Sequence, residues 1–124
     1  MNKSIIVTNS FKGYHQYKDA PENVAFLKEV HRHIFNVRTT IEVFNNDRDI
    51  EFFQLQQHIE TFVNVHYIAV NSQYLAGIHI ESCEALAEAV LTHLHSTFPG
   101  RRVRVEVWED NENGAIVEDE YGNF

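Results

Sequence analysis

A long alternating segment limits the possible folds more than any other feature of the chain. From position 31 to position 44, the odd positions carry two histidines and then mainly apolar residues, and most even positions carry polar ones. A period of two is typical of a β-strand with one buried face. The segment therefore predicts a strand over 31–44, which ends at the turn residues Asn45-Asn46-Asp47. Side chains two apart share a face, so His31 and His33 project together at one end of the inner face.

A second alternating segment, over 4–14, leads directly to His15. Two imidazoles on one strand supply half of a zinc site. If the two strands pair near these ends, His15, His31 and His33 meet and leave one coordination position open, which is the catalytic form of a zinc site. The alternative is that the histidines are hydrogen-bonded surface residues.

The remaining patterns predict an α+β domain that spans 1–124. Apolar stripes indicate helices over 50–63 and 83–97, and alternation indicates strands over 103–107 and 115–117 with a hairpin at Asn113-Gly114. A single helical turn is expected near 22–27, the stretch 64–80 has no clear pattern, and the acidic tail after 118 is expected to fray. The order ββααββ predicts one four-stranded antiparallel sheet with both helices on one face. The uncovered face and edges of such a sheet favour self-association.

Composition excludes several classes of partner. The 124 residues carry a formal net charge of −8, which disfavours electrostatic binding to nucleic acid or to an anionic membrane. No apolar run reaches membrane-spanning length, and the N-terminus enters a strand pattern without a signal-peptide core. The single cysteine, Cys83, excludes an internal disulfide and fits a reducing compartment. We therefore expect a cytoplasmic protein.

The segment Phe11-Lys12-Gly13-Tyr14-His15, followed by His31-Arg32-His33, resembles the metal motif of the 6-pyruvoyl-tetrahydropterin synthase family, F-x-A-A-H and then H-G-H. The segments 50–55, 82–87 and 105–109 are also similar to the family pattern, so the resemblance covers nearly the whole chain. It implies the tunnelling fold, with Zn²⁺ on His15, His31 and His33. It also implies a lyase of the 6-pyruvoyl- or 6-carboxytetrahydropterin synthase type (the latter belongs to the queuosine pathway), acting on dihydroneopterin triphosphate or a related pterin. The expected assembly is a homo-oligomer of three or six chains.

The resemblance also assigns roles to further residues. Glu109, at the end of the last long strand, would anchor the pterin by accepting its N–H donors. Ser82 and Glu84 open the second helix and are candidates for holding the ligand, although helix capping alone explains both. Glu29 lies two residues before His31 and is a candidate for proton transfer, the alternative being a solvated loop carboxylate. His66 is the nearest match to the Asp–His pair of the family.

Three departures from the family pattern affect the expected activity. Leu27 stands where the family has a cysteine, Arg32 replaces the glycine between the two histidines, and Val65 rather than an aspartate precedes His66. Leu27 and the missing Asp–His pair favour an alternative, a catalytically degenerate homologue that serves as a zinc- or pterin-binding module. The few basic residues leave a third interpretation open, cleavage of a neopterin without a triphosphate, unless Arg32, Arg38 or the group Arg101–Arg104 binds a triphosphate across a subunit interface. Cys83 is expected to be buried and inert.

Overall fold

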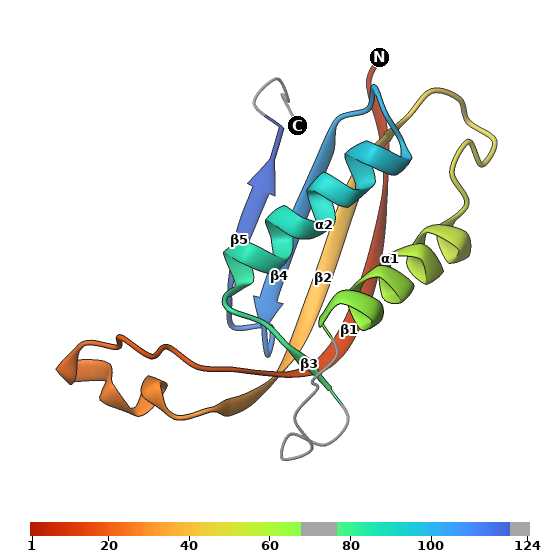
Figure 1. Ribbon diagram of the computed structural model, residues 1–124. Helices are drawn as coiled ribbons and strands as arrows, with labels where there is room; N and C mark the ends of the chain where they lie inside the picture. The colour runs from red at the N-terminus through yellow and green to blue at the C-terminus, as the bar shows by residue number, and fades with distance from the viewer. Residues whose placement is uncertain (68–76, 120–124) are drawn as a thin grey trace.

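The computed structural model describes residues 1–67 and 77–119. Its elements, in chain order, are β1 (Lys3–His15), the 3-10 helix η1 (Glu22–Lys28), β2 (His31–Val43), α1 (Phe52–Tyr67), β3 (Ile78–His79), α2 (Cys83–Thr97), β4 (Val103–Glu109) and β5 (Asn113–Glu118) (Figure 1). The strands form one sheet in the order β3-β1-β2-β4-β5. The predicted α+β class is confirmed.

The predicted four-stranded antiparallel sheet is wrong in one respect, because the described residues form a sheet that has five strands and is mixed. The four long strands pair antiparallel, but β3 pairs parallel with Gly13 and Tyr14 of β1. The backbone N–H of Ile80 also donates to the carbonyl of Tyr14 at 3.1 Å. A strand of two residues is too short to produce an alternating pattern, which is why the sequence does not reveal it. It lies on the edge of β1 next to His15.

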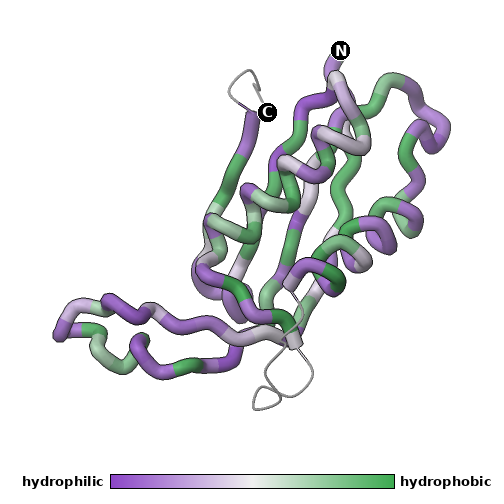
Figure 2. Tube along the Cα trace, viewed as in Figure 1, coloured by the Kyte–Doolittle hydropathy of each residue, from purple (hydrophilic) through white to green (hydrophobic). Residues whose placement is uncertain are grey.

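Both long helices pack on the same face of the sheet, α1 over β1 and α2 over β4 and β5 (Figure 1). The apolar positions of the strands and helices face each other across one core, and Figure 2 shows apolar residues recurring along these elements. The predicted stripe of α2 is buried as expected, at Leu86, Val90 and Leu94. In α1 the predicted Leu55 and Ile59 are buried together with Val63, whereas Phe52 and Phe62, expected on the same stripe, are exposed and half-buried. Within the described residues, neither helix combines the length and apolar character needed to cross a bilayer.

The element boundaries differ from the predicted ones where side chains act locally. The carboxylate of Glu51 accepts hydrogen bonds from the backbone N–H groups of Phe53 and Gln54, so α1 begins at Phe52. The helix ends at Tyr67, beyond the predicted end at residue 63. The turn between β4 and β5 comprises residues 110–112, directly before the predicted turn residues Asn113-Gly114, which belong to β5. Asp110 and Asn111 adopt positive φ there (52° and 58°), a conformation that these residue types tolerate best among non-glycine residues. The unassigned stretch 64–80 and the tail lie partly outside the described residues.

Candidate metal centre

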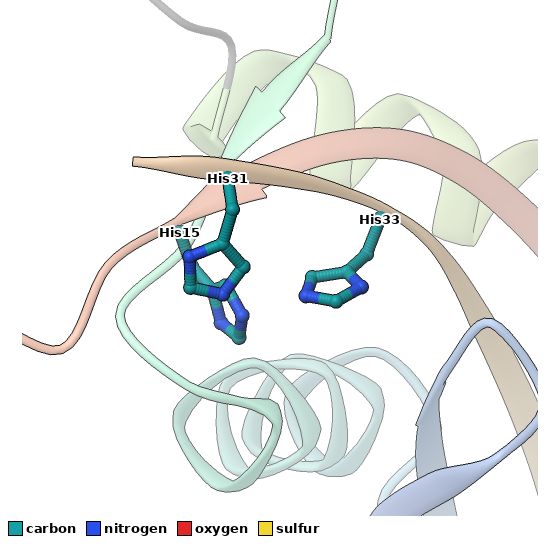
Figure 3. A group of neighbouring side chains, drawn as sticks. All are labelled: His15, His31 and His33. Atoms are coloured by element: carbon teal, nitrogen blue, oxygen red, sulfur yellow. The ribbon is translucent and has the colours of Figure 1, made fainter. Parts of the chain in front are cut away.

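Three histidines converge at the end of the β1–β2 ladder, as Figure 3 shows. In the register of this pair, His15 lies opposite His31 and Gly13 lies opposite His33. One nitrogen from each ring lies within 4.8 Å of the other two, and the ring centroids are 4.4 to 4.9 Å apart. Phe35, next on the same face of β2, touches the rings of His15 and His33 edge-on. The three donors can therefore hold a metal ion, in agreement with the predicted ligand set.

His31 carries the clearest sign of an ion. Its Nδ1 lies 2.8 Å from the backbone carbonyl oxygen of Glu29, which can only accept, so Nδ1 carries the proton. Its Nε2 therefore holds a free lone pair, and this buried atom has no hydrogen-bond partner among the residues that the structure describes. A buried nitrogen without a partner is costly unless something satisfies it. A metal ion between the three rings would do so.

The orientation of His33 is fixed from the β4–β5 turn. Its Nδ1 lies 2.5 Å from Asp110 Oδ2, while Asp110 Oδ1 accepts the backbone N–H of Ile34 at 2.8 Å. The hydrogen bond from His33 is the main reason that the pKa of the Asp110 carboxyl lies below its ordinary value. A carboxylate on Nδ1 directs Nε2 toward the metal position, which is a common arrangement around protein zinc ions.

Glu109 brings a carboxylate to the same place. Its Oε2 lies 2.9 Å from His15 Nε2 and 3.7 Å from His33 Nε2. Burial, with His31, His33 and His79 nearby, lowers the pKa of His15 to about 4. His15 is therefore neutral near pH 7, which is the form that binds a metal. Glu109 lies beside the cluster, where it can accept hydrogen bonds from a ligand that reaches the metal.

The cluster opens into a cavity of about 840 Å³ between η1, the start of α2 and the β4–β5 turn. His15, His31, His33 and Glu109 form one wall of this cavity. Other walls come from Tyr17, Phe26 and Leu27, from residues 81–84, and from Asn113 and Gly114. A cavity of this size accommodates a small organic molecule.

The start of α2 contributes both of the predicted ligand-holding residues to the cavity. Ser82 caps the helix, its hydroxyl accepting the backbone N–H of Ala85 at 3.1 Å, and Glu84 lies in the first turn. Cys83, between them, is buried, and this burial with Glu109 and Glu84 nearby raises its pKa to about 12. It therefore stays a thiol at neutral pH. Leu27 lines the cavity with an aliphatic side chain.

The two residues predicted for proton transfer lie elsewhere. Glu29 directly follows η1 and has an exposed side chain; its backbone carbonyl contacts His31. His66 lies on α1, where its ring packs on Phe62 and its Nδ1 lies 2.9 Å from the Phe62 carbonyl. Neither belongs to the described residues that line the cavity. Their catalytic roles stay predictions.

Sequence reasoning missed Asp110 and Phe35 as supports of the metal cluster. The register of β2 with β4 places Phe35 opposite Glu109, so the residue after Glu109 reaches the backbone of Ile34 and the ring of His33. The signal was an acidic residue directly after a strand whose partner carries the histidines, but it depends on knowing the strand register.

Comparison with known proteins supports the fold and nothing finer. No protein-family model matches the chain, and no curated protein matches it. Among solved structures, it is similar to an uncharacterized protein from Wolinella succinogenes, with a TM-score of 0.67 and 15% sequence identity over 97% of this chain and 99% of that one. The likeness shows that this α+β arrangement occurs over the full length of another protein.

Proposed function

We propose that the protein is a zinc-dependent enzyme that acts on a pterin, in the manner of 6-carboxytetrahydropterin synthase. The observation that carries the metal assignment is the buried Nε2 of His31, which belongs to a three-histidine cluster and has no hydrogen-bond partner in the described part of the chain. Three imidazoles with an adjacent cavity are the donor set of catalytic zinc sites. The pterin assignment rests on the sequence resemblance and is supported by Glu109, whose carboxylate lies beside the cluster.

Bound zinc would act as a Lewis acid toward hydroxyl oxygens of the pterin side chain. The residues of the chain would position the substrate. Glu109 would accept the adjacent N–H donors of the pterin ring in a charge-assisted pair. Ser82 and Glu84 border the same cavity and would contact the remainder of the ligand. Glu29 and His66 stay candidates for moving the proton. The assembly that the resemblance implies, a trimer or a pair of trimers, is part of the same proposal.

The first test is the zinc content of the purified full-length chain by elemental analysis. We expect roughly one zinc per chain in the wild type and a large loss in His31→Ala. His95→Ala serves as the matched control, because His95 pairs with Asp119 on another part of the molecule. A protein that stays metal-free in zinc-replete medium would contradict the proposal.

A second candidate function is a module that binds zinc and a pterin without turnover. It is favoured by Leu27 in the cavity wall and by the exposed positions of Glu29 and His66. The two functions separate in one experiment with the zinc-loaded protein. Consumption of a dihydropterin that is lost in Glu29→Gln supports the enzyme, and saturable binding with no product supports the module.

A further inference from the structure

We infer that the ligand of the cavity is a pterin with an uncharged hydroxylated side chain, and that a pterin triphosphate is disfavoured. This inference rests on the proposed function and specifies its substrate class. It follows from the charges that line the cavity, from the positions of the cationic side chains and from the aromatic residues at the rim.

The described residues that line the cavity carry four carboxylates, from Asp19, Glu81, Glu84 and Glu109, against the single ammonium of Lys18. The two positive charges of a zinc ion would leave this lining net negative. A triphosphate carries several negative charges and needs a cluster of cations or backbone N–H groups to replace its water. The cavity repels such a group.

The arginines of the chain are held elsewhere. Five of the six pair with carboxylates outside the cavity: Arg38 with Glu106, Arg48 with Asp47, Arg101 with Asp49, Arg102 with Glu42 and Arg104 with Glu118. The sixth, Arg32, lies between His31 and His33 on β2, so its side chain projects from the opposite face of the sheet. None of them lines the cavity in the part of the chain that the structure describes.

The rim of the cavity suits an uncharged planar ligand instead. Phe26 and Tyr17 border it with 72% and 51% of their surface exposed, although large aromatic side chains are usually covered. Their rings offer flat apolar surface for stacking on a bicyclic heterocycle. Hydroxyl groups on its side chain would reach the metal position without placing negative charge among the carboxylates.

The test compares two probes on the zinc-loaded full chain by isothermal titration calorimetry, 7,8-dihydroneopterin and its triphosphate. We expect the triphosphate to bind more weakly by roughly a factor of ten at low salt, and the difference to shrink as salt screens the carboxylates. Replacing Glu81 by lysine should raise triphosphate affinity by roughly threefold or more. Glu88→Lys makes the same charge change on an exposed residue of α2 outside the cavity lining and should do less.

The outcomes separate the inference from the proposed function. Tighter binding of the triphosphate would overturn the inference and leave a zinc- and pterin-binding protein. A Glu81→Lys effect no larger than that of Glu88→Lys would overturn its electrostatic basis. If zinc is retained but neither pterin binds, the pterin assignment fails and the inference fails with it. Circular dichroism of both variants checks that they are folded.

Discussion

At the scale of single residues, the contacts around the histidines define what the cluster can bind. An imidazole presents one nitrogen to an ion in a defined direction when its other nitrogen is held by a hydrogen bond. For His31 the Glu29 carbonyl does this, and for His33 the Asp110 carboxylate does. Such second contacts set both ring orientation and ligand basicity. The metal affinity should therefore depend on Asp110, which contacts His33 and is not itself one of the three ligands.

Asp110→Asn tests this dependence. Asparagine tolerates the positive φ at this position and can still accept the N–H of Ile34, so the turn should survive. The negative charge beside His33 Nδ1 is lost, and zinc affinity should fall by roughly 10- to 100-fold. Competition with a chromophoric chelator measures the change. Glu112→Gln, in the same turn, is the control; equal affinities of Asp110→Asn and the wild type would show that Asp110 has no role in metal binding.

At the scale of elements, alternation and helical periodicity predicted the long strands, both helices and the inner-face position of the histidines. These features depend on near neighbours in the chain, so a single sequence contains them. The β3 strand and the contact of Asp110 with His33 depend on pairing between distant segments, and no local pattern encodes that pairing. The same limit explains the proton-transfer candidates: Glu29 would share the metal face only if β2 began before His31.

Close packing between β1 and its neighbours places the metal ligands. A Cβ on Gly13 would lie 2.6 Å from Phe35 Cδ2 and 2.9 Å from Ile78 Cγ1, so both side chains would have to move. Gly13→Ala should lower the free energy of unfolding by about 1–3 kcal/mol. Because Phe35 supports the rings of His15 and His33, zinc affinity should fall too. Urea denaturation and zinc titration measure both effects, with outward-facing Lys12→Ala as the control; a fully neutral Gly13→Ala would contradict this packing.

A pair of histidines outside the metal cluster joins the two helices. His58 Nε2 on α1 lies 2.8 Å from His93 Nε2 on α2, and the His93 ring stacks on Phe62 with centroids 4.1 Å apart. One of the two nitrogens must stay unprotonated to accept the bond. Burial, together with His58 and His66, lowers the pKa of His93 below the 6.5 of an unperturbed histidine. The hydrogen bond of neutral His93 to His58 therefore stabilises the contact between α1 and α2.

This pair should make stability sensitive to acid. As pH falls through 6.5, the unfolded chain takes up a proton before folded His93 does, so the free energy of unfolding decreases toward the lower folded-state pKa. His93→Phe keeps a ring on Phe62 but cannot titrate, and should lose less stability between pH 7.5 and pH 5.5. Urea denaturation with EDTA at both pH values measures this. The other histidines are common to both proteins, so identical pH dependence would exclude His93 as the source.

At the scale of the whole molecule, the sheet ends in an edge that the described chain leaves open. β5 pairs with β4 on one side, and on the other side no described strand follows it. Exposed strand edges invite pairing with another chain. The self-association expected from the sequence therefore has a candidate surface in β5, next to the turn that holds His33 through Asp110. An assembly through this edge would place two chains near each metal cluster.

A proline in β5 tests whether the assembly uses this edge. The N–H of Asp119 donates to Val103 of β4, and N–H groups alternate along an antiparallel strand, so the N–H of Ile116 points away from β4. Ile116 is 48% exposed, and a proline there removes an outward donor without breaking the bonds to β4. We expect light scattering to give a mass of several chains for the wild type and for Ile116→Thr, and a smaller mass for Ile116→Pro. If Ile116→Pro is folded and keeps the wild-type mass, the subunits meet through another surface and β5 stays a free edge.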